Sequence, residues 1–322
     1  MKIGNTELKH GLMLAPMAGY TDMAMRRICY KYGAEYSVTE MVSAKAVCFL
    51  DKKTHALAKI GYDEGPVAVQ IFGSEPDIMA RAAEILSRGE DGGALPVAID
   101  INMGCPVHKI FSNGEGSALM KNPDLIYKIV RAVSSAIDIP CTVKLRAGVD
   151  SDSKNAVDCA LAAEAGGASL IAVHGRTRAE MYAGKADMAV VKDVKKSVQI
   201  PVVANGDVCS GDDALRVLSE TGADGVMVGR AAIGNPFVFS EIVAEASGKE
   251  YVLPTLSERV EAALFQLSLA IEEKGEAVAV REARKQIALY LRSFRGAAQI
   301  RAEINKAQTY LEVERALCSA LE

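Results

Sequence analysis

Two kinds of segment alternate along the chain from its start to about residue 240. Short apolar runs rich in β-branched residues are each followed by a stretch in which apolar residues recur with helical spacing. Most of the apolar runs are continuous, which is typical of parallel strands that are covered on both faces. We expect strands at Leu12–Ala15, Tyr36–Thr39, Val67–Ile71, Ala98–Asn102, Cys141–Leu145, Leu170–His174, Val202–Ala204 and Gly225–Val228.

The intervening stretches predict helices, and the count of repeating units predicts the architecture. Eight β/α units is the number that closes a TIM barrel. A doubly wound open sheet is the competing α/β architecture, but it normally has fewer strands and a GxGxxG motif after the first one. Here the first strand runs into Ala15-Pro16-Met17-Ala18-Gly19, so the pattern favours the barrel. The clearest helices are expected at Asp77–Arg88, Pro123–Ile137, Ser153–Glu164 and Asp212–Glu220.

The pattern changes after Gly234-Asn235-Pro236, where strand-like runs stop and consecutive helices begin at about residue 255. Ser257 is the expected N-cap of the first of these helices, with Glu258 in its first turn. Gly275 and Gly296 are expected to break the helical region. This is more helix than a barrel needs for closure. We therefore expect a barrel domain over residues 1–240 and a small all-helical domain over residues 241–322.

Composition and charge exclude several classes of protein. With 50% hydrophobic and 24% charged residues among 322, the chain is neither disordered, nor collagen-like, nor a coiled coil. Its 37 Lys and Arg against 41 Asp and Glu give a net charge of −4, so any basic surface must be local. The sequence shows no membrane span and no signal peptide. Its seven cysteines lack disulfide or metal-ligand spacing, so we expect a reduced, cytoplasmic protein without metal.

The ends of the last two expected strands carry a candidate phosphate site. These strands run into Asn205-Gly206-Asp207 and Gly229-Arg230. Glycines there would let backbone N–H groups approach a ligand, and Arg230 would add positive charge. Tight turns alone could explain either glycine. Because the two motifs follow strands seven and eight, where TIM barrels usually bind phosphate, they favour a phosphorylated cofactor or substrate.

Three other strand ends carry reactive side chains on the same expected rim. Lys144 could stabilise negative charge on a flavin ring, or could form a Schiff base. His174 ends the sixth strand and is one of four histidines in the chain. Cys105 follows the fourth strand in a loop shaped by Gly104 and Pro106. A thiol with an ordinary pKa of about 8.5 is mostly protonated at neutral pH, so Cys105 suits a proton donor at least as well as a nucleophile.

A basic stripe in the C-terminal region is a candidate nucleic-acid surface. If residues 281–295 form one helix, the stripe spans an arc of about 100° opposite an apolar face. Such a face suits a phosphate backbone, although a solvated helix face is the ordinary alternative. Only Glu282 and Glu303 interrupt the basic residues between Arg281 and Lys306, which favours RNA. The stripe comprises Arg281, Arg284, Lys285, Arg292 and Arg295.

Taken together, the motifs resemble those of the tRNA-dihydrouridine synthases. They occur in order from about residue 12 to the C-terminal helices, and the chain is most similar to the bacterial B-type branch of that family. The stretches that carry the resemblance are Ala15-Pro16-Met17-Ala18-Gly19, Gln70-Ile71-Phe72-Gly73, Asn102-Met103-Gly104-Cys105-Pro106, His174-Gly175-Arg176-Thr177, Asn205-Gly206-Asp207 and Gly229-Arg230.

The resemblance implies an FMN enzyme that takes electrons from NADPH or NADH and reduces the C5–C6 double bond of uridine in tRNA. Apart from the resemblance, we expect a monomer. Hydride would go from reduced FMN to C6, and Cys105 would protonate C5 on the opposite face. The helical domain would help to hold the tRNA. The FMN contacts implied are Pro16, Met17, Ala18 and Gln70 at the isoalloxazine, Lys144 and His174 near the ring, and Asn205, Gly206, Asp207, Gly229 and Arg230 at the phosphate end. The tRNA contacts expected from the resemblance and the stripe are Asn102, Lys109, Arg176, Arg178, Arg281, Arg284, Lys285, Arg292 and Arg295.

The chain departs from the family pattern at Gln286 and Leu289, where His and Trp are frequent, and at Met188, where Trp is usual. Gly89–Pro96 has the look of an insertion. Three alternatives remain at this point: a flavin barrel acting on a free pyrimidine, similar to dihydroorotate dehydrogenase; a non-catalytic RNA-binding barrel; and a flavin-free aldolase that uses Lys144. The basic stripe argues against the first, and the intact reactive residues argue against the second.

Overall fold

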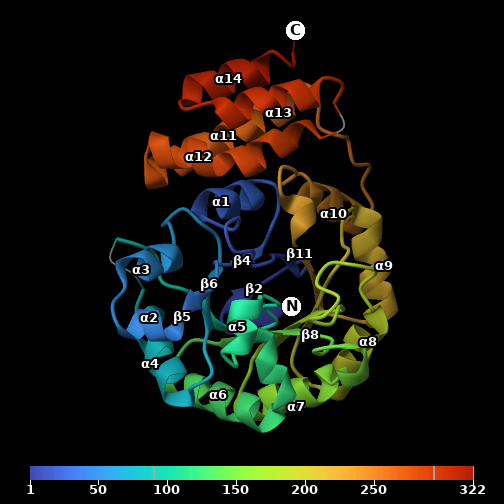
Figure 1. Cartoon of the computed structure of the whole chain (residues 1–322). Helices are drawn as coiled ribbons and strands as arrows, with labels where there is room; N and C mark the ends of the chain where they lie inside the picture. The colour runs from blue at the N-terminus through green and yellow to red at the C-terminus, as the bar shows by residue number, and fades with distance from the viewer. Residues whose placement is uncertain (90–91, 293, 322) are drawn as a thin grey trace.

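A closed barrel of eight parallel strands forms the centre of the computed structural model, which describes residues 1–89, 92–292 and 294–321 (Figure 1). Each strand pairs with the next in the order given below, and the last pairs with the first. Every strand expected from the sequence is present, with ends within one residue of the expectation. The strands are β3 (Leu12–Leu14), β4 (Tyr36–Val38), β6 (Val67–Phe72), β7 (Ala98–Met103), β8 (Cys141–Arg146), β9 (Leu170–His174), β10 (Val202–Asn205) and β11 (Gly225–Val228).

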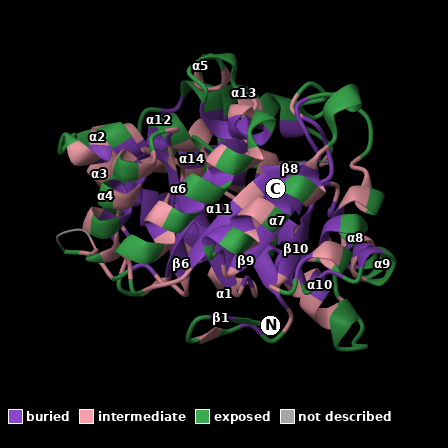
Figure 2. Ribbon diagram, turned by 90° about the horizontal axis from the view of Figure 1, so that it is seen from below, coloured by how far each residue is buried: buried purple, intermediate pink, exposed green. Residues whose placement is uncertain are grey.

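Alternation along each strand divides the barrel into two cores. Met13, Tyr36, Ala172 and Met227 belong to a cluster inside the barrel. The intervening residues belong to a larger cluster between the strands and the surrounding helices. Both faces of the sheet are therefore covered, which explains the continuous apolar runs. Figure 2 shows the strands as buried and the outer surfaces of the surrounding helices as exposed.

Helices surround the strands and confirm the TIM-barrel architecture. Local sequence fixes their ends: Ser210 caps α9 by accepting from the Asp213 N–H, and Gly222 ends it in the left-handed region at φ 69°. The helix expected from Ser153 begins later, because residues Ser151–Ser153 form a 3₁₀ turn capped by Asp150. The barrel helices are α1 (Met23–Lys31), α2 (Ala44–Cys48), α4 (Pro76–Ser87), α6 (Pro123–Ala136), α7 (Ala156–Gly166), α8 (Met188–Ser197), α9 (Gly211–Thr221) and α10 (Val238–Ala246).

Several short elements have too few residues to show a period in the sequence. A two-stranded antiparallel hairpin precedes the barrel, and β5 adds to the edge of β6. Residues 90 and 91 of the expected insertion Gly89–Pro96 lie outside the described residues. The short elements are β1 (Lys2–Ile3), β2 (Thr6–Glu7), β5 (Val42–Ser43), α3 (Lys52–Ala58), α5 (His108–Ser112), and the 3₁₀ helices η1 (Gly116–Lys121), η2 (Ser151–Ser153) and η3 (Arg230–Ala232).

The C-terminal region forms a layer of helices with its own apolar core. The expectation that Ser257 caps the first helix is wrong: Thr255 is the N-cap, and its side chain and that of Glu258 form a capping box. Gly275 and Gly296 break the region as expected. The elements are α11 (Leu256–Lys274), α12 (Glu276–Ile287), the 3₁₀ helix η4 (Ala288–Leu291), α13 (Ala297–Lys306) and α14 (Tyr310–Cys318).

This helical layer lies beside α1 and α10, as Figure 1 shows, and α11 packs on α1. The Lys274 ammonium donates to the Asp22 carboxylate across the junction at 2.6 Å. Residue 240, our expected domain boundary, falls inside α10, which packs against α9. Among the helices of residues 1–89, 92–292 and 294–321, none is long and apolar enough to cross a membrane.

Candidate active site

A cavity of about 910 Å³ opens at the carboxyl ends of the barrel strands. All the residues that the resemblance assigns to FMN line it, although they come from six different strand ends. Cys105, Asn102 and Arg292 line it as well. The expected residues in its wall are Pro16, Met17, Ala18, Gln70, Asn102, Cys105, Lys144, His174, Asn205, Gly206, Asp207, Gly229, Arg230 and Arg292.

Strand register decides which of these side chains meet. Gln70 lies opposite Asp100, and Asn102 lies opposite Lys144. His174 lies opposite Asn205 on the next strand. Because parallel strands end together on one rim, residues far apart in the sequence reach one cavity.

Lys144 and His174 form a polar wall with unusual electrostatics. The Lys144 ammonium donates to the Asn205 side-chain oxygen at 2.8 Å, and Asn205 donates to the Met227 carbonyl at 2.7 Å. Burial, with the nearby Arg146 charge, lowers the pKa of Lys144 to about 7. Burial and the surrounding cations lower the pKa of His174 to about 2, so its imidazole is neutral at physiological pH. Lys144 can therefore carry or release a proton near neutral pH, whereas His174 can offer only one N–H.

Hydrogen bonds with two other side chains hold the Cys105 loop. The side-chain oxygen of Asn102 accepts from the Cys105 N–H at 2.9 Å and from the Gly104 N–H at 3.3 Å. Arg146 donates to the Gly104 carbonyl at 2.8 Å. The cysteine is 9% exposed, and burial raises the pKa of its thiol. Cys105 is therefore protonated at neutral pH and faces the cavity.

The expected phosphate corner combines open backbone with a rigid support. Gly206 and Asp207 both have positive φ, 120° and 54°. The Asp207 carboxylate accepts from Arg176 at 2.8 Å and from the Ala186 N–H at 2.7 Å. These bonds hold the pKa of Asp207 below its ordinary value although its desolvation opposes this. At Gly229 no described atom would lie nearer than 3.7 Å to an added Cβ, so its backbone is open to the cavity.

The cavity wall does not include every residue expected to contact tRNA. Arg176 is buried and supports Asp207. The Arg178 guanidinium covers the Phe111 ring at 4.1 Å, and Lys109 is exposed on α5. For these residues tRNA contact stays a prediction.

The basic stripe is not one helix face. Helix α12 ends at Ile287 and a 3₁₀ turn follows, so the single-helix geometry expected for residues 281–295 is wrong. Arg284 is half-buried and donates to the Ala307 carbonyl at 2.5 Å. Lys285 lies over the Tyr20 ring at 4.8 Å, near the cavity. Arg281 and Arg295 are exposed, and Arg292 alone of the five reaches the cavity wall among the described residues.

Sequence reasoning missed several residues of the cavity wall. Arg146 follows Lys144 by two positions on β8, so strand alternation could have placed both on the inner face. Tyr182 comes from the loop after β9, and the Arg146 and Arg230 guanidinium groups lie 5.9 and 4.6 Å from its ring centroid. Nothing in the local sequence marks Tyr182, because only the folded loop brings it to the rim.

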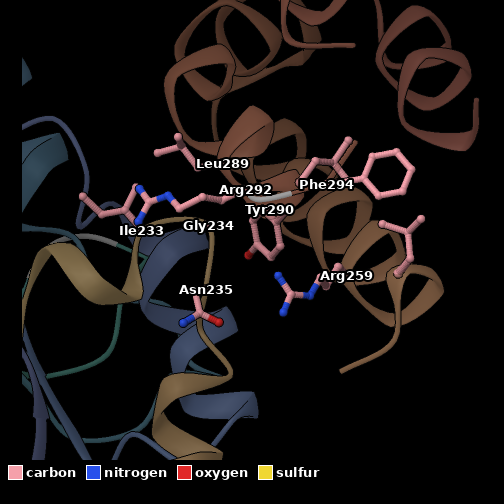
Figure 3. Close-up of a pocket in the computed structure, with 10 residues that line it drawn as sticks. Ile233, Gly234, Asn235, Arg259, Leu289, Tyr290, Arg292 and Phe294 are labelled. Carbon is pink, nitrogen blue, oxygen red and sulfur yellow. The ribbon is translucent and has the colours of Figure 1, made fainter. Parts of the chain in front are cut away.

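A second pocket, of about 400 Å³, lies at the junction with the helical layer (Figure 3). Ile233, Leu289 and Arg292 line both this pocket and the main cavity, so the two are neighbours. In Figure 3 the Arg259 and Asn235 side chains lie on opposite sides of its lower part. Leu289, one of the departures from the family pattern, is therefore at this opening. Gln286, another departure, is buried and donates to the Tyr20 carbonyl at 3.3 Å.

Within the described ranges, no group of three or more His, Cys, Asp or Glu side chains converges as a metal site would require. The cavity thus presents a neutral imidazole, a lysine, arginines and a thiol, with open backbone at one end. This set can bind an anionic group and hold a proton at Cys105.

Comparison with known structures supports the fold. Histamine dehydrogenase from Rhizobium superposes with a TM-score of 0.59 at 14% identity, over 84% of this chain and 50% of that one. A 2-naphthoyl-CoA reductase superposes with a TM-score of 0.57 at 12% identity, over 77% of this chain and 52% of that one. The chain thus spans about half the length of each. At these identities the likeness shows a shared barrel fold and nothing more.

Comparison of sequences shows the family. The chain is 41% identical over 314 residues to tRNA-dihydrouridine synthase B of Shewanella oneidensis, covering 97% of this chain and 95% of that protein. It is 42% identical over 308 residues to the protein of that name from Vibrio parahaemolyticus, covering 95% and 94%. A model of the dihydrouridine synthase family matches residues 13–321. With the strand-end motifs gathered around one cavity, these matches establish that the chain belongs to the dihydrouridine synthase (Dus) family.

Proposed function

We propose that this protein reduces the C5–C6 double bond of a uridine in tRNA to 5,6-dihydrouridine, using FMN and NADPH. The printed names of its relatives and the family match support the reaction. The observation that carries the proposal is the protonated Cys105 thiol, which faces a cavity that Lys144 and His174 also line.

The cavity residues fit FMN. A volume of about 910 Å³ lies within the range of cofactor pockets. The backbone at Gly229 leaves open the space that a Cβ would fill, and Arg230 supplies a cation for a phosphate. Lys144 and neutral His174 supply donors to the polar edge of the ring. Bound there, FMN would supply the hydride for C6 of the uracil.

The chain's own residues do the rest of the work. The Cys105 thiol, protonated because burial raises its pKa, holds the proton that C5 receives on the face away from the flavin. Asn102, beside the thiol, can hydrogen-bond the uracil edge. A uracil reaches such a cavity only when it is unstacked, so the target nucleotide must be flipped out of the tRNA.

The junction pocket extends the proposal to the rest of the tRNA. Because it shares three lining residues with the cavity and carries Arg259 and Arg292, it suits the backbone phosphates next to the flipped uridine. Arg281, Lys285 and Arg295 would add exposed positive charge on the helical layer. We place the enzyme in the cytoplasm as a monomer.

A flavin-reoxidation trace tests the proposal. The purified protein is reduced with NADPH without oxygen and mixed with tRNA that lacks dihydrouridine, while flavin absorbance is followed. Return of oxidised flavin with tRNA, but not with uracil or orotate, is expected. If the free pyrimidine reoxidises the flavin and tRNA does not, the substrate is the free pyrimidine and not tRNA. A protein that takes up no FMN would overturn the cofactor assignment.

A further inference from the structure

A buried chain of hydrogen bonds leads from the middle of the barrel to the Cys105 loop. The Thr142 hydroxyl and the Gln70 amide nitrogen donate to the two oxygens of Asp100, at 2.6 and 2.7 Å. Asn102 donates to the Gln70 side-chain oxygen at 2.8 Å. The oxygen of Asn102 then accepts from the Cys105 N–H at 2.9 Å. Asp100 is 3% exposed and Gln70 1%, so these bonds are shielded from bulk water.

The chain has a fixed direction because its two ends have opposite character. Burial raises the pKa of Asp100, whereas the hydrogen bonds from Thr142 and Gln70 and the Lys144 charge oppose that shift and favour the carboxylate. A carboxylate only accepts, and a backbone N–H only donates. Between these ends, Gln70 must turn its nitrogen toward Asp100, and Asn102 must turn its nitrogen toward Gln70. Only that arrangement presents the Asn102 oxygen to the Cys105 loop.

We propose that Asp100 is a positioning residue, which sets the direction of this chain and thereby holds the proton-donating Cys105 loop in place. Asp100 does not line the cavity, so it acts through Gln70 and Asn102 rather than on the substrate. The inference rests on the proposed function for the role of Cys105, but the hold on the Cys105 loop follows from the hydrogen bonds alone.

Thr142 makes the proposal testable, because a hydroxyl can accept as well as donate. In Asp100→Asn, the new amide oxygen can accept from Gln70 while its nitrogen donates to Thr142, so the direction survives. In Thr142→Val, the carboxylate still accepts from Gln70. In the double variant the amide nitrogen has no acceptor at residue 142. Turning all three amides leaves the new oxygen facing the valine side chain at position 142 and moves the unpaired N–H groups to the Cys105 loop, at the cavity wall. A buried oxygen is left unpaired more readily than a buried N–H, so the turned arrangement is the favoured one.

The expected result is therefore a non-additive loss. Each single variant should change the rate of flavin reoxidation by tRNA only about twofold, and the double variant should fall about tenfold below the product of the two effects. Asp100 also faces the Lys144 charge, but that charge effect is common to both Asp100→Asn proteins and cancels in the cycle. Rates are taken per bound flavin, after reduction by NADPH has been measured for each protein.

A second readout needs neither tRNA nor turnover. The rate of alkylation of Cys105 by iodoacetamide, followed by mass spectrometry of its peptide, should rise about tenfold in the double variant alone. The alkylation rate of Cys318 in α14 serves as the internal reference. An unchanged melting temperature of the protein excludes general unfolding. Additive effects, or a Cys105 reactivity equal to that of the starting protein, would overturn the role of Asp100. If Cys105 reactivity rises in the double variant but tRNA does not reoxidise the flavin even in the starting protein, the role of Asp100 stands and the proposed function is rejected.

Discussion

Cys105 faces the cavity at the carboxyl ends of the strands, where we propose that the uracil lies. Burial keeps its thiol protonated, and two N–H groups of its loop are held by Asn102. A thiol in this state is a poor nucleophile at neutral pH and a suitable acid.

Cys105→Ala should leave flavin bound and reducible by NADPH, and should slow reoxidation by tRNA at least about a hundredfold, the lower range for loss of a general acid. Single-turnover absorbance traces measure both steps. Cys318→Ala, which removes a thiol from the helical layer, is the matched control and should behave as the starting protein. Full turnover by the Cys105 variant would remove this residue from its role.

Lys144 opposes folding in a pH-dependent way. Burial lowers its pKa from 10.5 to about 7, so between about pH 7 and pH 10 the unfolded chain binds more protons than the folded one. The destabilisation is complete below pH 7 and shrinks as the pH rises through this window.

Lys144→Met should therefore raise the melting temperature of the flavin-free protein most at pH 6 to 7, with the gain shrinking toward pH 10. Thermal unfolding at pH 6, 8 and 10 measures the difference from the starting protein. Lys249→Met, at an exposed lysine, should show no such trend. A difference that stays constant with pH would contradict the lowered pKa.

At the scale of elements, register and loops bring the site together. The parallel register sets Gln70 beside Asp100 and Lys144 beside Asn102. The loop after β11 lines the cavity, and at Gly234 it also packs directly against η4. Gly234 has φ 67°, and an added Cβ would lie 2.5 Å from the Leu289 Cβ and 2.6 Å from its carbonyl carbon.

Gly234→Ala should destabilise the protein by about 1–3 kcal/mol more than Gly248→Ala, because it adds overpacking to a similar backbone strain. Gly248 also has positive φ, 64°, and meets no described atom within 4 Å, so it is a matched control. Denaturant unfolding of both variants gives the difference. Equal losses would mean that the contact between Gly234 and η4 yields without cost.

At the scale of the whole molecule, the helical layer completes the site that the barrel begins. Gln286 donates to the Tyr20 carbonyl, and Lys285 covers the Tyr20 ring, so α12 supports the loop after β3 that lines the cavity. Arg259 and Arg292 lie on the helical side of the junction pocket. A long nucleic acid could therefore contact both parts while one base enters the barrel.

Replacing Arg259 and Arg292 together by Ala should weaken tRNA binding and lower the slope of log affinity against log salt by about one for each lost phosphate contact. Binding is measured by titration at several salt concentrations. Arg216→Ala, on the outer helix α9, should leave both affinity and slope unchanged. An unchanged slope in the double variant would place the tRNA backbone elsewhere.

The sequence alone determined the eight strands, the helices that follow them and the strand-end motifs. Strand periodicity and tight-turn glycines are local properties, so they can be read without the fold. The same is true of the breaks at Gly275 and Gly296. The N-cap at Thr255 was also predictable from the sequence, because Glu258 follows it by three residues as in a capping box. The expectation that Ser257 is the N-cap was wrong.

Only the tertiary structure decided how distant residues combine. It turned Arg176 into a support for Asp207, bonded Arg284 to the Ala307 carbonyl just after α13, and divided the basic stripe at Ile287. It also brought Tyr182 and Arg259 to pockets that no local pattern marks. Sequence records which side chain is present at each position, whereas burial, partner and protonation depend on neighbours that only the closed barrel and its helical layer supply.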